Sequence, residues 1–516
     1  MTEFSAFRSH RLRIRITTAV AALACSTALL LPGMAGAQTS ADDANATYDI
    51  VIQGGRVIDP ASGRDEVANV GINDGTVAAI ATTPLNGRQV LDATGQVVAP
   101  GFIDYHAHGQ DPKSQSFQLL DGVTTAMEME SGVMPVADYY ANKTGKALIN
   151  FGATASFLCA RIEVLTDEEC VMNGALSSSA TTLAPAALTT PANEEQEDAI
   201  LAAVKREIDA GALGIGIGLE YAPGIGRREI YRAFKTAAEA DVPVFVHVRM
   251  REESRAPGMP IAVANELIAD AAATGAALQL VHVTSTALGD APTVIEIMKG
   301  AAANGVDVTT EAYPYEAGST ALGSEFFSEG WQERSNVTYG DVQWTATGER
   351  LTEETFNKYR KENPEGTVVI FMIPQEAIDA AMADPFVSIA SDGMVMNDPK
   401  VHPRGAGSFS RVLGHFVRER GVLDLNTALA KMTIMPARRL EKVAPAMARK
   451  GRIDVGADAD IVVFDPATVT DNATFEDPQQ PSSGYRYVLV DGKVMVQNGE
   501  ITPNLFPGEG IKRGAQ

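Results

Sequence analysis

A regular alternation of short β-branched runs with helical stretches between residues 99 and 446 constrains the fold most. Such alternation predicts parallel βα units, and eight runs are the number that a closed (β/α)8 TIM barrel needs. We therefore predict an α/β chain whose barrel spans residues 99–446. The candidate strands are Gly101–His106, Val123–Glu130, Asn150–Phe157, Ala212–Leu219, Val242–Val248, Leu278–Val283, Val306–Ala312 and Val387–Ser391.

The gap between the seventh and eighth candidate strands exceeds an ordinary connection. It contains both tryptophans of the chain, Trp331 and Trp344. Two interpretations are open: an insertion that covers a substrate site, or a structural embellishment of the barrel.

Both ends of the chain are rich in strand and hairpin patterns. Apolar and polar residues alternate over Asp49–Asp59, and Asn73-Asp74-Gly75 lies between two further β-rich runs. Similar strand and hairpin patterns occur at Asp460–Phe464 and around Asp491-Gly492. These patterns predict one small β-sandwich domain formed by residues 38–98 and 447–516 together. The alternative is a set of hairpins that decorate unrelated domains.

The first 37 residues have the pattern of a secretory signal peptide. A cationic start precedes the apolar run Ile16–Leu31, and Ala35-Gly36-Ala37 is a small-residue cleavage motif. The alternative is a membrane anchor, but the run is short and Pro32-Gly33 ends it. We expect a periplasmic or secreted protein with no membrane association after cleavage. In that compartment Cys159 and Cys170 can form a disulfide or remain two free thiols.

Composition excludes several classes of protein. With 45% hydrophobic residues the chain can form large buried cores, which excludes a mainly disordered protein. The formal net charge of −23 argues against a nucleic-acid partner, because most of the surface would repel phosphates. Three Cys are too few for a disulfide scaffold. A homo-oligomer is compatible with the sequence, which does not fix the oligomeric state.

Four of the six histidines after the signal peptide stand at the ends of candidate strands. His106 and His108 follow the first strand, where residues two apart share a face, while His247 and His282 end the fifth and sixth strands. Asp392 follows the eighth strand. A barrel gathers these strand ends at one mouth, and a buried group of unpaired imidazoles is costly without a cation. The five residues therefore predict a metal site.

These motifs resemble the amidohydrolase superfamily. The run Val98–Asp104 leading into His106 and His108, followed by the later His, His and Asp, is typical of its members. The resemblance implies one or two divalent metals at a barrel mouth and the hydrolysis of amides, esters or amine-bearing carbons. Gly218–Gly224 and Tyr313–Thr320 narrow the likeness to the N-acyl-D-amino-acid deacylases, and further motifs extend it over nearly the whole mature chain. The further motifs are His402–Arg404, Arg411–Gly414, Met432–Leu440 and Ala457–Thr468.

One motif departs from that group. Deacylases of this kind often carry a Cys ligand at the end of strand two, whereas here Gly122–Thr125 leads into Glu128 and Glu130 without a Cys. Glu130 lies nearer the strand end and is our candidate metal ligand, because a carboxylate can bridge two divalent ions as a thiolate can. Glu128 is expected to be a core carboxylate or to support a ligand. The segment is most similar to D-glutamate deacylases, and no Lys falls on the fourth strand, which disfavours a hydantoinase or dihydroorotase.

A mechanism follows from the predicted ligands and the resemblance. Zn²⁺ suits imidazole and carboxylate donors best, with Mn²⁺ or Co²⁺ as substitutes. Asp392 is expected to act as the base towards the attacking water and then as the acid towards the leaving amine. Tyr221 or His282 would orient the carbonyl of the amide.

An amino-acid substrate carries a carboxylate, for which Arg249 and Arg404 are the candidate cations and Tyr315 a hydroxyl partner. The alternative for each Arg is a surface ion pair. The expected substrate is an N-acyl-D-amino acid, with N-acyl-D-glutamate as the acidic case. The alternatives are another amidohydrolase, such as a dipeptidase or lactone hydrolase, and a secreted zinc-binding or solute-binding protein without activity.

Overall fold

Eight parallel strands form the centre of the computed structural model, which describes residues 46–173, 185–249 and 258–514. The predicted signal peptide lies outside the described residues. All eight predicted strands are present, several of them shorter than predicted. They are β6 (Phe102–Asp104), β7 (Val123–Met134), β8 (Asn150–Ser156), β10 (Ile215–Gly218), β11 (Val244–His247), β12 (Leu278–Leu280), β13 (Val308–Ala312) and β17 (Val387–Ile389).

The sheet closes almost completely into a barrel. Its hydrogen-bonded order runs β17-β13-β12-β11-β10-β8-β7-β6. An isolated parallel bridge between Ala107 and Gly393 joins the two edges, and the amide of Asp392 donates to the carbonyl of His106 at 2.8 Å. The (β/α)8 barrel predicted from the sequence is confirmed.

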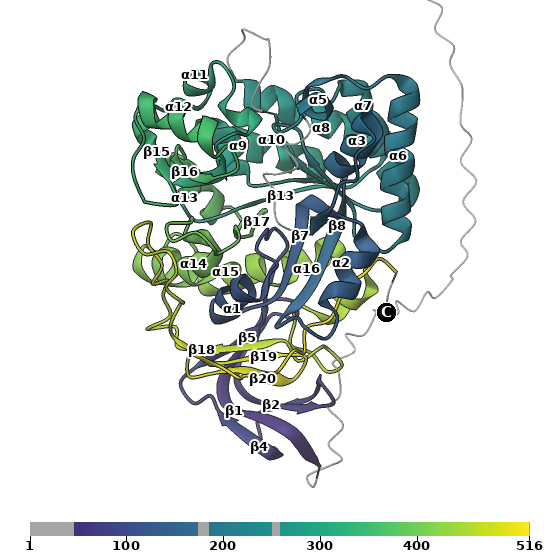
Figure 1. The fold of residues 1–516 in the computed structure, drawn as a ribbon. Helices are drawn as coiled ribbons and strands as arrows, with labels where there is room; N and C mark the ends of the chain where they lie inside the picture. Colours follow the sequence, from purple (N-terminus) through teal and green to yellow (C-terminus); the bar gives the residue numbers. More distant parts are fainter. Residues whose placement is uncertain (1–45, 174–184, 250–257, 515–516) are drawn as a thin grey trace, which may run out of the picture. The chain divides into compact units, whose positions relative to one another are not determined.

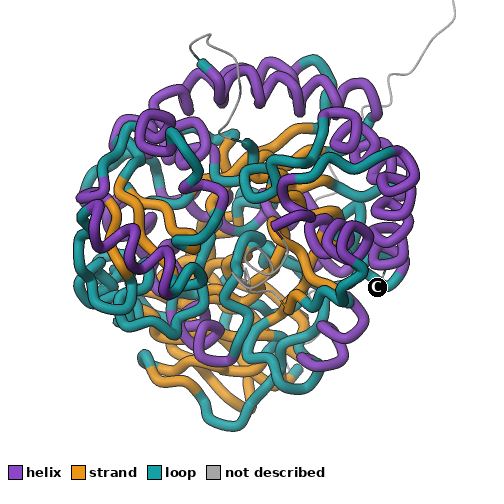
Figure 2. Tube along the Cα trace, turned by 45° about the horizontal axis from the view of Figure 1, so that its top comes forward, coloured by secondary structure: helices purple, strands orange, loops and turns teal. Residues whose placement is uncertain are grey.

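Helices follow the strands and lie outside them, as Figure 2 shows. In α6 the pattern behind such a helix is clear: Asn193 and Gln196 form a capping box, and Ile200, Val204 and Ile208 are buried one turn apart. The helices around the barrel are α1 (Pro112–Leu120), α2 (Val136–Lys143), α3 (Phe157–Thr166), α5 (Pro185–Thr189), α6 (Glu194–Asp209), α7 (Arg227–Ala240), α8 (Met259–Thr274), α9 (Val283–Ala287), α10 (Ala291–Ala303), α13 (Gln375–Ala383), α14 (Arg404–Arg411), α15 (Leu425–Met432) and α16 (Ile434–Leu440). None of the helices in the described ranges combines the length and apolar content that crossing a bilayer requires.

The glycine-rich fourth strand has a steric reason. A Cβ atom on Gly216 in β10 would lie 2.4 Å from the carbonyl oxygen of Glu130. Glycine therefore lets β7 approach β10 closely near the carboxyl ends of the strands. In the sheet β8 lies between β7 and β10; β7 pairs with β8 up to Glu128 and again at Val133 after a register shift, so Glu130 lies in an irregular part of the strand.

A second, nine-stranded sheet joins the two ends of the chain. In Figure 1 the purple N-terminal strands lie beside the yellow C-terminal ones. The junction is β5, which pairs in parallel with β1 and antiparallel with β18, so the predicted β domain built from both termini is confirmed. The strands are β1 (Thr47–Asp59), β2 (Arg64–Asn73), β3 (Thr76–Ala81), β4 (Asn86–Asp92), β5 (Val97–Pro100), β18 (Ile461–Phe464), β19 (Tyr485–Val490), β20 (Lys493–Gln497) and β21 (Glu500–Ile501).

A buried lysine stabilises the base of this sheet. The Nζ atom of Lys450 lies 3.0 Å from Asp458, 2.8 Å from Asp460 and 3.4 Å from Asp491. The side-chain amide of Asn150 in β8 donates to Asp460 at 3.0 Å. One ionic cluster therefore ties the sheet formed by the termini to a barrel strand.

The long gap between β13 and β17 folds into a small unit with its own core. Its antiparallel sheet has the order β14-β16-β15, and Trp331 and Trp344 are both buried in its apolar cluster. The elements are β14 (Ala317–Ala321), α11 (Trp331–Ser335), β15 (Val342–Trp344), α12 (Glu353–Glu362) and β16 (Thr367–Phe371).

A disulfide joins Cys159 and Cys170, a pairing that the sequence left open. It links α3 to the segment before β9 (Met172–Asn173).

Candidate metal centre

The carboxyl ends of the barrel strands bring together all six residues predicted to bind metal. One group consists of His106, His108, Glu130 and Asp392, and a second of Glu130, His247 and His282. Within each group the candidate ligand atoms lie within 4.8 Å of one another, and every member is buried. The barrel thus makes one cluster from residues that are up to 286 positions apart in the sequence.

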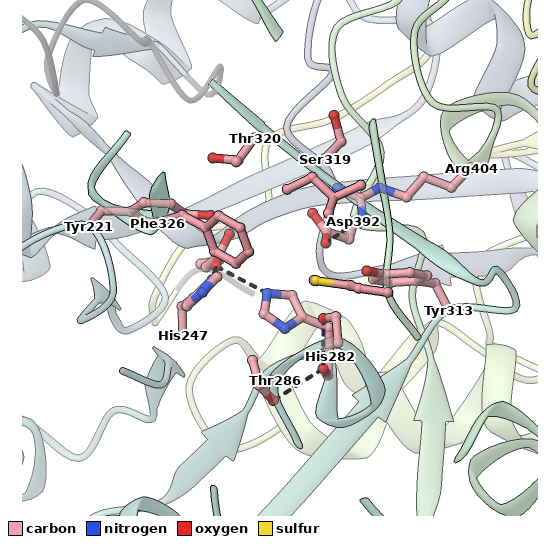
Figure 3. Close-up of a pocket in the computed structure, with 15 residues that line it drawn as sticks. Tyr221, His247, His282, Thr286, Tyr313, Ser319, Thr320, Phe326, Asp392 and Arg404 are labelled. Carbon is pink, nitrogen blue, oxygen red and sulfur yellow. Dashed lines mark hydrogen bonds and ion pairs between the residues drawn. The ribbon is translucent and has the colours of Figure 1, made fainter. Parts of the chain in front are cut away.

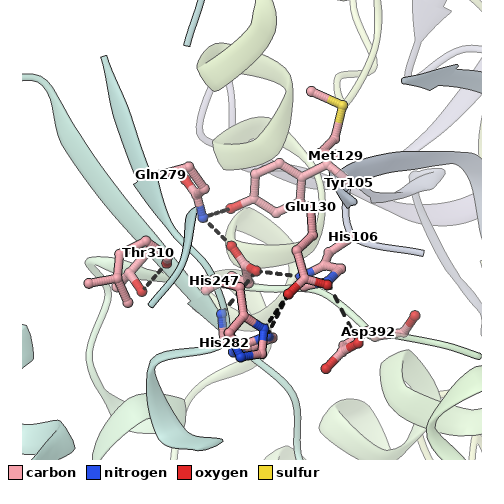
Figure 4. Close-up of polar contacts among 12 residues, drawn as sticks. Tyr105, His106, Met129, Glu130, His247, Gln279, His282, Thr310 and Asp392 are labelled. Atoms are coloured by element: carbon pink, nitrogen blue, oxygen red, sulfur yellow. Dashed lines mark hydrogen bonds and ion pairs between the residues drawn. The ribbon is translucent and has the colours of Figure 1, made fainter. Parts of the chain in front are cut away.

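Glu130 belongs to both groups because its two oxygen atoms face opposite sides (Figure 4). Oε2 lies 3.1 Å from Nε2 of His106 and 3.0 Å from Nε2 of His108. Oε1 contacts Nδ1 of His247 and lies 3.3 Å from Nε2 of His282. A carboxylate in this position can bind one cation through each oxygen.

Two further carboxylates support the histidines from behind. Nδ1 of His108 lies 2.7 Å from Glu128, and Nδ1 of His106 lies 2.8 Å from Glu311. Both carboxylates are fully buried. Glu128 therefore contacts a candidate ligand and stays outside the cluster. Glu311 was missed by sequence reasoning; the one available signal was its place near the end of the seventh strand.

The electrostatics of the cluster favour a bound cation. Burial alone lowers the pKa of His106, but the carboxylates of Asp392 and Glu130 outweigh it and raise the pKa to about 10. Burial likewise opposes the charge of Glu130, yet the nearby imidazoles hold its pKa well below the usual range. The site is thus built to hold positive charge at its centre.

The donor set also fits a metal ion. Nε2 of His108 makes no hydrogen bond of good geometry with any described residue, although carboxylate oxygens of Glu130 and Asp392 lie 3.0 and 3.2 Å from it. Buried polar atoms are normally hydrogen-bonded, so a nitrogen that faces two carboxylates without such a bond is suited to a shared cation. Imidazole nitrogens and carboxylate oxygens are the donors that divalent transition metals prefer. The cluster is a metal-binding site.

Asp392 lies between the cluster and an arginine. Its Oδ1 atom is 3.2 Å from Nε2 of His108, and its Oδ2 atom is 2.9 Å from Nη1 of Arg404. Burial opposes ionisation of Asp392, but the guanidinium of Arg404 and the imidazole of His106 hold its pKa well below its ordinary value. Asp392 is therefore a carboxylate at neutral pH and can accept a proton.

A pocket opens onto this cluster (Figure 3). Glu130, His247, His282 and Asp392 form its floor. The insertion between β13 and β17 supplies one wall, so it covers the site in addition to having its own core. The wall residues are Gly318, Ser319, Thr320, Phe326, Ile370 and Met372.

The four residues predicted to bind substrate divide into two pairs. Tyr221 and Arg404 line the pocket; the ring of Tyr221 packs on His247 with the centroids 4.7 Å apart. Arg249 and Tyr315 are not among the lining residues. Arg249 donates to the carbonyl of Ile225 at 3.2 Å, and the ring of Tyr315 packs edge-on against His402.

Comparison with known proteins agrees with this architecture. The model of the amidohydrolase family matches residues 145–496. N-acyl-D-glutamate deacylase of Alcaligenes xylosoxydans xylosoxydans is 30% identical over 491 residues, which cover 90% of this chain and 97% of that protein. D-aminoacylase of the same organism is 28% identical over 485 residues, covering 88% and 96% of the two chains.

A solved structure extends the likeness to three dimensions. N-acyl-D-glutamate deacylase from Bordetella bronchiseptica has a TM-score of 0.75 and 26% identity to this chain, covering 90% of this chain and 100% of that one. That protein is complexed with zinc and a phosphonate inhibitor that mimics the tetrahedral intermediate of its reaction. Together with the barrel and its metal-binding cluster, these matches show that the chain belongs to the amidohydrolase family.

Proposed function

We propose that this protein is a metal-dependent hydrolase that cleaves the amide bond of N-acyl-D-amino acids, N-acyl-D-glutamate among them, to a carboxylate and a free D-amino acid. The observation that carries the proposal is the contact of Asp392 with Arg404 beside the metal-binding cluster, at the floor of a pocket. It places a base and a cation for a substrate carboxylate side by side. The preference for D-amino acids rests on the deacylase relatives.

We propose zinc as the metal, and two ions rather than one. The two oxygens of Glu130 face separate groups of histidines, which supports two neighbouring sites that share this carboxylate. Zinc is the ion named with the Bordetella deacylase. When bound, such a cation supplies Lewis-acid chemistry, which polarises a carbonyl and acidifies water.

Asp392 performs the proton transfers in this scheme. The carboxylate takes a proton from water as the water oxygen attacks the amide carbon, and it later returns the proton to the nitrogen as the C–N bond breaks. Its depressed pKa keeps it ionised and ready for the first step. The reaction consumes one water and yields one carboxylate and one ammonium group, which carries the remaining proton.

Arg404 and Tyr221 would position the substrate. Arg404 is buried, and its Nε atom has no hydrogen-bond partner among the described residues. A buried guanidinium with a free donor is suited to a carboxylate. Tyr221 packs against His247 at the opposite side of the pocket in Figure 3, where its hydroxyl can orient the carbonyl.

The test is a panel of N-acetyl-D- and N-acetyl-L-amino acids, combined with metal analysis of the purified protein. We expect turnover of D substrates and about two zinc ions per chain. The Asp392→Asn variant controls for contaminating hydrolases; its kcat should fall by at least about 100-fold while zinc stays bound, because losing acid–base catalysis costs this much. Turnover of L substrates only, turnover of dipeptides or lactones instead, or unchanged activity in the variant would refute the proposal.

We further propose that the protein acts in the periplasm or outside the cell. The signal-peptide pattern of residues 1–37 supports this, and so does the disulfide between Cys159 and Cys170, since such bonds persist in oxidising compartments. N-terminal sequencing of the exported protein should begin at Gln38. An uncleaved protein retained in the cytoplasm would contradict export.

A further inference from the structure

Glu311 occupies a central position directly behind the metal-binding cluster. It lies near the end of β13 with only 1% of its surface exposed. Its Oε1 atom is 2.8 Å from Nδ1 of His106 and also accepts the backbone N–H of His282 at 3.1 Å. We infer that Glu311 is a positioning residue that holds one histidine from each half of the cluster, and so couples the two metal sites.

The contact with His106 fixes the role of each ring nitrogen. When Nδ1–H donates to the Glu311 carboxylate, the lone pair stays on Nε2, the atom that faces the cluster. Nε2 of His106 lies 3.1 Å from Glu130 and 3.6 Å from Asp392. A carboxylate behind an imidazole orients the ring and makes its other nitrogen a better ligand.

The contact with His282 acts on the backbone. His282 has φ +32° and ψ +61°, in the left-handed region that a residue with a Cβ atom rarely adopts. Such a conformation persists when surrounding contacts fix it. The hydrogen bond from the His282 amide to Glu311 is one such contact, and it directs the imidazole towards Glu130.

Glu311 is itself held rigidly. Its second oxygen accepts from Nε2 of Gln279 on β12, and the same amide group lies 2.9 Å from the hydroxyl of Tyr105. Tyr105 in turn contacts Ser388 on β17. Figure 4 shows Gln279 and Tyr105 beside the cluster. Side chains on β12 and β17, together with Tyr105 just after β6, thus leave the carboxylate little freedom to move.

Glu128 provides an internal comparison. It too accepts from a histidine, His108, but its other oxygen accepts the amide of Ser131 and contacts no second histidine of the cluster. Loss of Glu128 should therefore affect one metal site, whereas loss of Glu311 should affect both. The inference rests on the metal centre of the proposed function.

The test is zinc binding by the full-length protein after its metal has been stripped with a chelator. Zinc affinity and stoichiometry are measured by competition with a chromophoric chelator, so no substrate is needed. In Glu311→Gln we expect both zinc ions to bind about 10- to 100-fold more weakly, the usual effect of removing a carboxylate behind a metal-binding histidine. In Glu128→Gln we expect only one ion to be weakened.

Glu229→Gln is the matched control, because Glu229 is equally buried but pairs with Arg161. It should lose thermal stability and keep both zinc affinities. Two zinc ions bound by Glu311→Gln with wild-type affinity would overturn the inference. If that variant does not fold, Glu311→Asp is used instead, because it keeps the charge but moves the carboxylate oxygens away from the histidines. It should bind both zinc ions more weakly, and wild-type zinc affinity in Glu311→Asp would overturn the inference equally. Wild-type protein that binds no zinc would instead refute the proposed metal centre itself.

Discussion

Replacing Arg404 with methionine tests the proposed substrate geometry most directly. Methionine retains much of the side-chain volume but removes the guanidinium that lies 2.9 Å from Asp392 and 4.6 Å above the ring of Tyr313. The proposal holds that this group binds the substrate carboxylate. In the variant, kcat/KM should therefore fall more for substrates that carry this carboxylate than for substrates that lack it.

The expected loss follows from the donors involved. Each hydrogen bond between charged groups contributes about 1.5–3 kcal/mol, and Arg404 can offer at least two donors. We therefore expect at least about 3 kcal/mol of transition-state stabilisation to disappear, or about 100-fold in kcat/KM.

A pair of substrates separates carboxylate binding from damage to Asp392. An N-acyl-D-amino acid is compared with the corresponding N-acyl amine, which has no carboxylate. Wild-type protein should prefer the acid by about 100-fold or more, and Arg404→Met should show almost no preference. Arg411→Met is the control, because Arg411 stands at the other end of α14, contacts Asp471 at 3.1 Å and does not line the pocket. An unchanged preference in Arg404→Met would refute the reasoning.

Two further predictions concern stability. In chelated, folded protein the pKa of His106 is raised from its ordinary value of 6.5 to about 10. The contribution of this histidine to the free energy of unfolding is therefore fully present below pH 6.5 and is lost as the pH rises towards 10. The pKa difference sets an upper limit of about 5 kcal/mol on that contribution. The thermal unfolding temperature of chelated protein should thus fall between pH 6.5 and 10. That of zinc-loaded protein should change less, because the cation takes the place of the proton. Unfolding temperatures that fall in parallel with pH in both forms would contradict this prediction. Lys450→Met should lower the free energy of unfolding by about 3–5 kcal/mol, because it leaves three buried or half-buried carboxylates without their cation. The control is Lys442→Met, because the ion pair of Lys442 with Asp241 is exposed. The free energy of unfolding of both variants is measured by denaturant titration. A loss for Lys442→Met as large as that for Lys450→Met would contradict the argument from burial.

The barrel could be predicted because its signals are local. Each parallel strand is buried on both faces and reads as a short apolar run, and the strand ends carry the histidines in the sequence itself. The closing Asp392 is recognisable for the same reason, since it follows the eighth run directly. Predicted strand ends were less accurate: β12 ends at Leu280, two residues before His282, because the backbone there turns into the left-handed region.

The supporting contacts could not be predicted from the sequence. Glu311 and His106 are 205 positions apart, and their hydrogen bond depends on the register of strands that are not neighbours in the chain. The same holds for the pocket wall, where Phe326 and Met372 reach the pocket only through the fold of the insertion. Arg249 follows a candidate ligand in sequence, yet its guanidinium donates to a loop carbonyl.

The sheet shared by β5 and β18 has a consequence for how the molecule is made. The ribosome must synthesise some 360 residues after β5 before β18, the antiparallel neighbour of β5, is available to pair with it. Until then the hydrophobic edge of β5 has no antiparallel neighbour, and closing so long a loop is slow. The newly synthesised chain therefore depends on residues 461–501 to finish the sheet that residues 47–100 begin, and a polypeptide terminated before residue 461 should be a substrate for proteases even if its barrel is complete.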